Sequence, residues 1–101
     1  MTATHPRHHL DELVHQPVRF SLLATLAAAE EAEFAFVRDA IEVSDSVLSK
    51  HAATLEAAGY LAVRKGHVGK RPRTWLRLTD QGRAAFEAHV ALLQAIAAGE
   101  R

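Results

Sequence analysis

A helix pattern that runs directly into a strand–loop–strand pattern, within residues 44–77, most constrains what this chain can fold into. The helix is predicted to begin at Ser44, a favourable N-cap residue. It is predicted to stop at Gly59, because glycine readily adopts the left-handed conformation that ends a helix. Residues 60–65 and 74–78 are typical of two strands joined by a loop that contains Gly and Pro. The pattern therefore predicts a helix packed beside a β-hairpin.

The same stretch carries a local positive charge. Residues 44–77 contain seven Lys or Arg and two acids, a net charge of +5, whereas the whole 101-residue chain is formally neutral. The remaining residues therefore carry −5. Local field, rather than total charge, decides whether a surface attracts phosphate, so this partition indicates a nucleic-acid partner.

The rest of the sequence predicts helices on both sides of that stretch. We expect helices over residues 10–15, 17–29, 35–41 and 80–98, and a very short strand at Phe34. The helix over residues 35–41 is expected to bury Phe36, Val37 and Ile41. This order indicates an α+β, mainly α fold: a winged helix-turn-helix with a two-stranded wing and a long C-terminal dimerisation helix.

The length of the chain fits one domain with a single core. We expect that domain to span residues 10–98, between a flexible N-terminal tail over residues 1–9 and a C-terminal tail over residues 99–101. No apolar run approaches the roughly 18 residues that cross a bilayer, and no secretory signal is visible. A cytoplasmic, nucleoid-associated protein without a membrane partner is therefore expected.

A helical wheel divides the helix over residues 44–58 into two faces. Leu48, Ala52 and Leu55 fall on the buried face, and His51 lies at its edge. The opposite face is small, hydroxylated and basic, and short side chains of this kind permit close approach to a major groove. From this helix we expect DNA contacts by Ser44, Ser46, Ser49, Lys50 and Thr54. The alternative is an ordinary amphipathic helix whose polar face is only solvated.

The hairpin that follows, called the wing, carries six Lys or Arg and no acid over residues 64–77. Gly66 and Gly69 would permit its tight reversal. Its expected DNA contacts are Lys65 and Lys70 on phosphates, and Arg71 and Arg73 near the tip in a minor groove. Charges on a hairpin can instead protect an edge strand from aggregation. Protection needs only one or two charges, so six of one sign favour nucleic acid.

Five segments of the chain are PVRFSLL (17–23), LSKH (48–51), EAAGY (56–60), GKRPRT (69–74) and LTDQGR (78–83). In order and spacing they resemble the small winged-helix transcriptional regulators related to the MarR and ArsR groups, over about residues 10–98. The resemblance implies a homodimeric, sequence-specific DNA-binding regulator. It also implies that Ser46, Ser49 and Lys50 lie in the major groove, and that Arg71 and Arg73 act from the wing.

The chain departs from both groups in ways that bear on mechanism. It has no cysteine, whereas the metal-sensing ArsR proteins carry a Cys motif on their recognition helix. MarR proteins are usually longer, with extra terminal helices that form a ligand pocket, and here those helices are missing or abbreviated.

The last predicted helix is more apolar than one core contact needs. Between residues 84 and 98 only Glu87, His89 and Gln94 are polar. We expect a homodimer interface built from Leu10, Leu13, Phe86, Val90, Leu93 and Ile96. The alternative is a monomer in which this helix wraps on its own domain.

No pattern supports catalysis, a cofactor or a metal. The chain has no Cys ligand, its seven histidines are scattered, and no Gly-rich phosphate loop follows a strand. A metal bound by histidines at a dimer interface stays open.

Two further hypotheses remain beside a DNA-binding regulator. One is a winged-helix protein–protein interaction module. The other is a DNA-binding sensor whose affinity is set by a small ligand, of unknown identity, at the dimer interface.

Overall fold

The computed structural model describes residues 5–100, so residues 1–4 of the predicted N-terminal tail (1–9) and residue 101 of the predicted C-terminal tail (99–101) lie outside the described residues. The elements, in chain order, are η1 (Pro6–His9), α1 (Glu12–His15), α2 (Pro17–Ala27), β1 (Ala32–Glu33), α3 (Phe34–Ala40), α4 (Asp45–Ala57), β2 (Leu61–Val68), β3 (Arg71–Leu78) and α5 (Asp80–Ala97). The predicted order of helices and strands is confirmed, within a few residues at each boundary.

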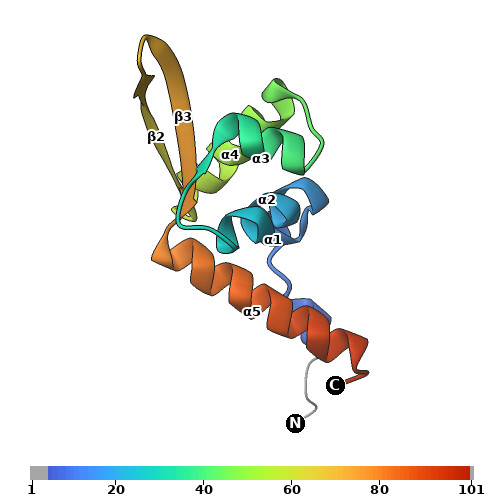
Figure 1. Ribbon diagram of the computed structural model, residues 1–101. Helices are drawn as coiled ribbons and strands as arrows, with labels where there is room; N and C mark the ends of the chain where they lie inside the picture. The colour runs from blue at the N-terminus through green and yellow to red at the C-terminus, as the bar shows by residue number, and fades with distance from the viewer. Residues whose placement is uncertain (1–4, 101) are drawn as a thin grey trace.

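The molecule is elongated, with principal extents of 61 × 24 × 21 Å. Figure 1 shows β2 and β3 projecting at one end, while the free end of α5 projects at the other. Between them, α2, α3 and α4 pack against one another and the base of the sheet. The three strands are antiparallel in the order β1-β3-β2, so the long strand β3 lies in the middle.

The core forms where α2, α3 and α4 meet the base of the sheet. Its fully or nearly buried apolar residues are Val14, Leu22, Leu23, Leu26, Ala32, Val37, Leu48, Ala52, Leu55, Leu61, Leu76 and Leu78. In α2, Leu22 and Leu23 lie four and three positions before Leu26, and in α4 Leu48, Ala52 and Leu55 lie four and three apart, which puts each set on one face of its helix. The burial that the helical pattern predicts for Val37, Leu48, Ala52 and Leu55 is thus confirmed.

The predicted burial of Phe36 is wrong. Its side chain is 63% exposed, whereas Val37 is fully buried. The buried stripe of α3 joins Phe34, Val37 and Ile41, spaced three and four residues apart, and Phe36 lies on the other side of the helix. The short strand expected at Phe34 lies just before it, at Ala32–Glu33.

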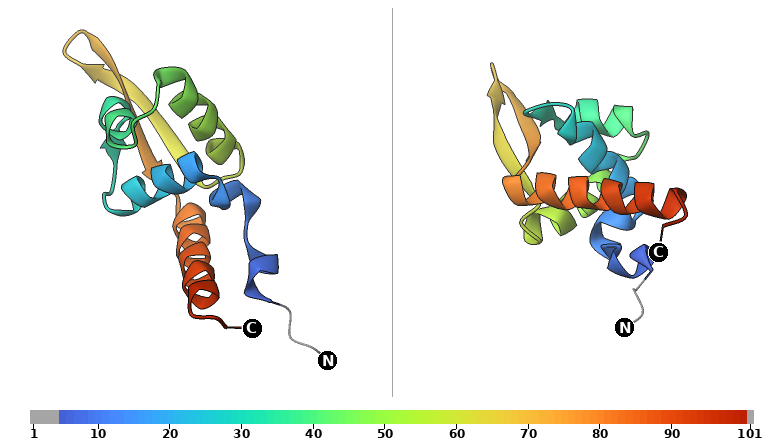
Figure 2. Two further views of the ribbon diagram at one scale, coloured as in Figure 1. Left: turned by 90° about the vertical axis from the view of Figure 1, so that its right-hand side faces the viewer. Right: turned by 90° about the horizontal axis from the view of Figure 1, so that it is seen from below.

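The segment before α1 is more ordered than the sequence predicted. Residues 6–9, expected to belong to a flexible tail, form the short 3-10 helix η1, capped by the His5 ring, which accepts a hydrogen bond from the Arg7 backbone N–H at 3.1 Å. Both views in Figure 2 place this segment beside the C-terminal half of α5, which it contacts. The division of the chain into domain and tails stays a prediction.

The strands of the wing are longer than predicted. They reach to Val68 and Arg71, which pair with each other and leave a two-residue turn at Gly69–Lys70. Gly69 has a φ of 63°, as the first position of such a turn requires. Gly66 is not part of the reversal: it lies within β2, where an added Cβ would approach the Trp75 ring to 3.2 Å.

The joint between α4 and α5 depends on close backbone contact. Gly59 has a φ of 83° and ends α4, as the sequence predicts. The Thr79 hydroxyl donates to the Gly59 carbonyl at 2.6 Å and accepts from the Gly82 backbone N–H at 2.9 Å, which caps α5. The Thr79 side chain thus links the end of α4 to the start of α5.

A pair of histidines joins the N-terminal helix to α5. His15 Nδ1 lies 3.0 Å from His89 Nε2, and His89 is only 1% exposed. Its Nδ1 has no hydrogen-bond partner among the described residues. Burial, and then the charge of His15, lower the pKa of His89 below its ordinary 6.5. If both rings were protonated, two N–H groups would face each other, so this contact requires at least one neutral ring.

We expect the free energy of unfolding to fall as the pH is lowered below about 6.5. Because the folded-state pKa of His89 is depressed, the unfolded chain takes up the proton first. This stability is therefore complete above the unfolded pKa and is lost as the pH falls through the folded one, at about 1.4 kcal/mol for each unit between them. Urea unfolding at pH 7.5 and 5.5, at fixed protein concentration, measures the loss.

A matched pair of variants assigns that loss. His89→Leu should show a smaller acid loss than the wild type, because the buried titrating group is gone. His67→Gln, at an exposed position of the wing, should keep the wild-type loss. Equal losses in the His89→Leu variant and the wild type would contradict the assignment.

Candidate nucleic-acid interface

α4 presents the face that the sequence predicts. Leu48, Ala52 and Leu55 are buried and His51 is nearly so. The side chains on the opposite side are exposed: Ser46, Ser49, Lys50, Ala53 and Ala57. Short side chains and one cation thus cover the exposed face, which leaves the helix backbone open to close approach by a large partner.

Three of the hydroxyls expected at this surface, those of Ser44, Ser46 and Thr54, already have partners. Ser44 Oγ accepts from the Val47 backbone N–H at 3.2 Å and so caps α4, which confirms its predicted capping role. Ser44 Oγ also lies 3.2 Å from Ser46 Oγ, and either hydroxyl could be the donor of that bond. Thr54 is half-buried, and its hydroxyl donates to the Lys50 carbonyl at 3.1 Å. Thr54 is therefore less available than its position on the helical wheel suggests.

An ion-pair cluster that sequence reasoning missed fixes the first turn of α4. Arg38 of α3 contacts Asp45 at 2.8 Å and Asp39 at 2.9 Å. The hydrogen bonds to Asp39 and Asp45 raise the pKa of the Arg38 guanidinium further above its already high value. Asp45 also lies at the positive end of α4, where a carboxylate is favourable.

The ladder register divides the wing into two faces. Lys65 pairs with Thr74 and points to the side on which α4 packs, since both line the groove beside that helix. Side chains alternate along a strand, so Arg71 and Arg73 belong to the opposite, outer face. Lys70 lies in the turn. The cations of the wing therefore lie on both of its faces instead of forming one row.

Two of the six wing cations are paired with carboxylates from the segment around β1. Arg64 makes a bidentate contact with Glu31, at 2.7 and 3.1 Å, and its guanidinium stacks 4.0 Å from the Trp75 ring centre. The hydrogen bond from Arg64 lowers the pKa of Glu31. Arg73, predicted near the tip, contacts Glu33 at 2.7 Å. Neither pair was predicted from the sequence.

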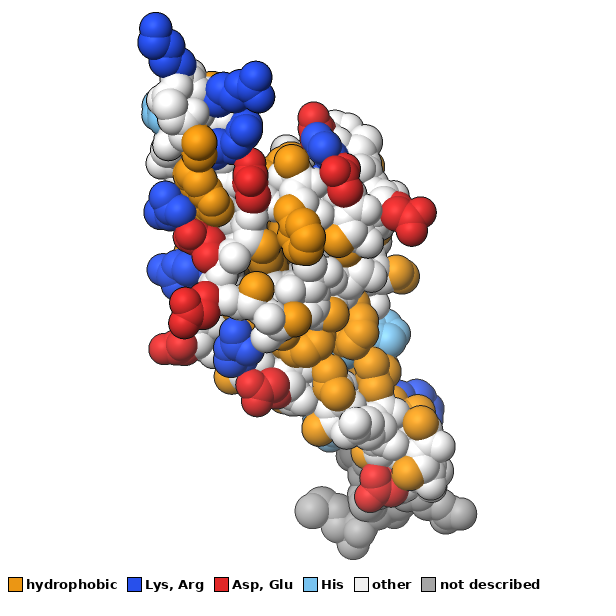
Figure 3. Space-filling view, in the orientation of Figure 1, with side chains coloured by type: hydrophobic (Ala, Val, Ile, Leu, Met, Phe, Trp, Pro, Cys, Tyr) orange, Lys and Arg blue, Asp and Glu red, His pale blue; other side chains and the backbone are white. Residues whose placement is uncertain are grey.

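The other wing cations have no ion-pair partner within residues 5–100: Lys65, Lys70, Arg71 and Arg77. Figure 3 shows Lys and Arg side chains gathered at the tip of the wing, at the top of the view. An unpaired cation at a projecting tip loses no internal contact when it meets a phosphate. Lys70 and Arg71 are thus available at the tip itself, whereas Arg77 pairs with Ala62 near the base of the hairpin.

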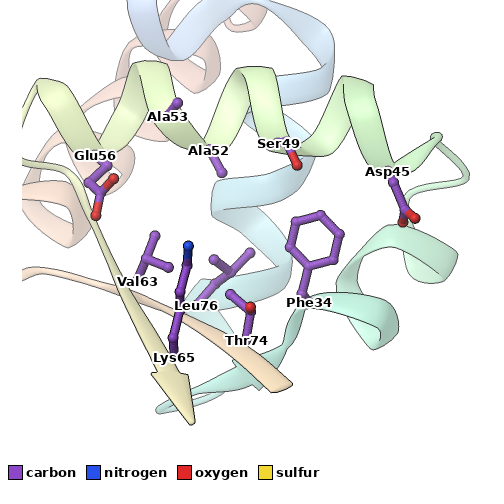
Figure 4. Close-up of a pocket in the computed structure, with 10 residues that line it drawn as sticks. All are labelled: Phe34, Asp45, Ser49, Ala52, Ala53, Glu56, Val63, Lys65, Thr74 and Leu76. Carbon is purple, nitrogen blue, oxygen red and sulfur yellow. The ribbon is translucent and has the colours of Figure 1, made fainter. Parts of the chain in front are cut away.

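An open groove of about 430 Å³ separates α4 from the wing. Figure 4 shows its lining, with Ser49 and Ala52 on the helix and Lys65 on β2 reaching towards it. Phe34, Val63 and Leu76 form the apolar part. Asp45 and Glu56 stand at the two ends of the helical side. The structure therefore brings together Ser49 and Lys65, two predicted contact residues from different elements, and adds two acids that were not predicted there.

Two negative observations apply to the described part of the chain. Between residues 5 and 100, no three His, Asp or Glu side chains lie close enough to hold a metal ion. No helix in this range has the length and apolar character needed to cross a membrane.

Comparison with known proteins gives matches over most of the chain. The model of the winged helix DNA-binding domain family matches residues 18–97. An uncharacterized protein of Methanocaldococcus jannaschii is 28% identical over 79 residues, which cover 78% of this chain and 86% of that protein. The structure of a transcriptional regulator homologue from Pyrococcus horikoshii OT3 matches with a TM-score of 0.82 at 25% identity, over 88% of each chain.

A likeness to MarR regulators is visible at the level of the fold. A MarR family transcriptional regulator from Silicibacter pomeroyi DSS matches with a TM-score of 0.69 at 23% identity. The match covers 87% of this chain but 58% of that regulator. These matches confirm the predicted winged-helix fold.

Proposed function

The chain belongs to the winged helix DNA-binding domain family, and we propose that it is a transcriptional regulator that binds a pseudo-palindromic DNA duplex as a homodimer. One observation carries the proposal: the small, hydroxylated face of α4 stands exposed beside a projecting hairpin whose tip cations are unpaired within residues 5–100. α4 would read the major groove, and the wing would contact the backbone and the minor groove. Such a regulator would act at the nucleoid, in the cytoplasm.

The contact residues divide by their surroundings. Ser46, Ser49 and Lys50 would meet base edges or phosphates, because their side chains are exposed on α4. Lys65, Lys70 and Arg71 would neutralise phosphates or enter the minor groove. The remaining proposed contacts are weaker: Ser44 as a donor from its cap, Thr54 at the flank, and Arg73 only after release from Glu33.

Salt dependence tests this assignment. Binding of a duplex to the wild type should weaken steeply as salt rises from about 50 to 200 mM, because each neutralised phosphate releases counterions. Lys70→Ala should reduce the slope of log affinity against log salt by about 1, and Arg73→Ala should change it less. Equal slopes in the wild type and the Lys70→Ala variant would remove Lys70 from the interface.

The homodimer rests on α5. Its side chains Val90, Leu93 and Ile96 are only half-buried, and the helix projects beyond the body of the domain. A projecting apolar helix is stabilised by a second copy that covers it. Phe86 contributes less, because its ring packs on Phe20 of the same chain at 5.4 Å. Leu10 and Leu13 lie on the N-terminal segment beside α5 and would extend the interface.

Leu93→Glu should convert the dimer to a monomer at micromolar concentration, because the interface would have to bury an unpaired carboxylate. Ala91→Glu is the matched control, since Ala91 is exposed on the other side of α5. Light scattering measures the mass of each variant. A monomeric wild type, or dissociation by Ala91→Glu but not by Leu93→Glu, would contradict the proposed interface.

A dimer of this kind supplies the geometry for sequence-specific binding. Two recognition helices related by a two-fold axis read half-sites about 34 Å apart, one turn of DNA. A small effector in the gap between dimer helices would act by changing that separation. The effector stays a prediction. The resemblance of the chain to transcriptional regulators favours regulation over catalysis.

A further inference from the structure

Arg19 of α2 stands where three helices meet. Its Nε and Nη2 donate to the carbonyls of Leu13 and Glu12 in α1. Its Nη1 lies 3.2 Å from Nδ1 of His51, on α4. One guanidinium therefore ties the N-terminal helix to the proposed recognition helix.

The chemistry of this contact fixes the state of His51. Arginine has only donors and stays charged, so His51 Nδ1 must accept the hydrogen bond. The ring is then neutral, with its proton on Nε2. A second proton on Nδ1 would remove the acceptor and set a cation against the guanidinium. Since His51 is only 8% exposed, water would screen that repulsion poorly.

We propose that Arg19 is a positioning residue, which holds α4 in its DNA-reading orientation through neutral His51 and releases it when His51 is protonated. This inference rests on the proposed DNA-binding function, and it adds a proton-controlled contact behind the recognition surface. Arg19 is hydrogen-bonded to α1, and α1 also contacts α5 through His15 and His89. The contact thus lies between the proposed dimer helix and the proposed reading helix.

Charged neighbours act on His51 in one direction. Burial has the largest effect on the pKa of His51, followed by the cations of Arg19 on α2 and Lys50 on α4. All three lower this pKa below 6.5. On the α1 side, the Arg19 guanidinium donates only to two backbone carbonyls. The bond is therefore intact above about pH 6.5 and is lost as the pH falls through the lowered value.

The sign of this effect separates it from ordinary electrostatics. Positive charge gained in acid by any exposed group near the proposed DNA surface would tighten binding as the pH is lowered. Release of α4 by His51 would weaken binding in acid instead. A DNA affinity that falls as the pH is lowered is thus the opposite of what added surface charge would produce, and the His51→Asn variant assigns it to the buried contact.

The experiment measures duplex affinity at pH 7.5 and 5.5, at fixed salt and with EDTA present. We expect wild-type affinity to fall about tenfold at the lower pH, the worth of one hydrogen bond to a charged group. His51→Asn places a neutral acceptor where Nδ1 stands, and its affinity should change less than about threefold. His67→Asn should lose at least as much affinity as the wild type at the lower pH, because its Arg19–His51 contact is unchanged. Circular dichroism at both pH values confirms that each variant is folded.

Two further readouts decide the case if His51→Asn folds poorly. Nitrogen NMR of the wild type should show His51 as the Nε2–H tautomer, and Arg19→Gln should raise its pKa by removing the cation. Arg19→Lys keeps the charge but not the three bonds, and should weaken duplex binding at pH 7.5. An Nδ1–H tautomer, or the same pH dependence in the His51→Asn variant and the wild type, would overturn the inference.

The outcomes also separate this inference from the function on which it rests. A wild type that binds no duplex at pH 7.5 contradicts the proposed function, and with it any role of Arg19 in DNA reading. A wild type that binds well, but tighter in acid, leaves the function intact and overturns the inference alone.

Discussion

Replacing Lys50 and Arg71 together with glutamate should lower the affinity for duplex DNA at least about a hundredfold at low salt, because each change removes one phosphate contact and adds one repulsion. Lys50 is exposed on α4 and Arg71 is exposed next to the turn of the wing. Neither has an ion-pair partner within residues 5–100, so the loss falls on DNA binding and not on the fold. Fluorescence anisotropy with a labelled duplex measures the change.

The control carries the same change in total charge at a distance. Arg7 lies in η1 and Arg83 in α5, both exposed and away from the wing. Their double replacement by glutamate should cost much less affinity than the change at Lys50 and Arg71. An equal loss in the two variants would mean that total charge, not the proposed surface, governs binding.

Gly82→Ala should destabilise the protein by about 3 kcal/mol or more, the range of severe overpacking in a rigid core. A Cβ at Gly82 would stand 1.9 Å from the carbonyl oxygen of Tyr60 and 2.7 Å from its carbon. Both are backbone atoms, and that carbonyl accepts from the Thr79 N–H at 3.2 Å. The first turn of α5 would have to move away from the Tyr60 backbone, which immediately precedes β2. The close contact that fixes the start of α5 would then be lost.

Gly99→Ala is the comparison for that variant. Gly99 has a φ of 75° but open space around it, so alanine there costs only backbone strain, about 1 kcal/mol. Chemical denaturation of both variants measures the difference. Equal stability of the two would show that the backbone at Gly82 can move apart without cost.

Local features of this fold could be predicted from the sequence because they depend on neighbouring residues. The period of α4 fixes which of its side chains face the core, and this part is confirmed for Leu48, Ala52 and Leu55. Ser44 and Gly59 mark the ends of that helix by their own chemistry. The charge of the wing is likewise visible in its composition.

The remainder depends on contacts between distant positions, which a single sequence does not show. The sequence predicts an unpaired Arg73 near the tip. In the structure, the pairing of β1 with β3 brings Glu33 beside Arg73. The His15–His89 contact spans 74 positions and the Arg19–His51 contact spans 32. The error at Phe36 has a different cause. The short helix α3 carries apolar side chains on more than one side, and only packing decides which side is buried.

The measurement that tests the proposed function most directly is retention of fragmented genomic duplex DNA by the protein, with sequencing of what is retained, at about 50 and 200 mM salt. The proposed dimer predicts enrichment of one inverted repeat, with half-sites about one turn apart and retention that falls steeply as salt rises. No retention at the lower salt, or retention without any shared sequence, would contradict a sequence-specific dimeric regulator.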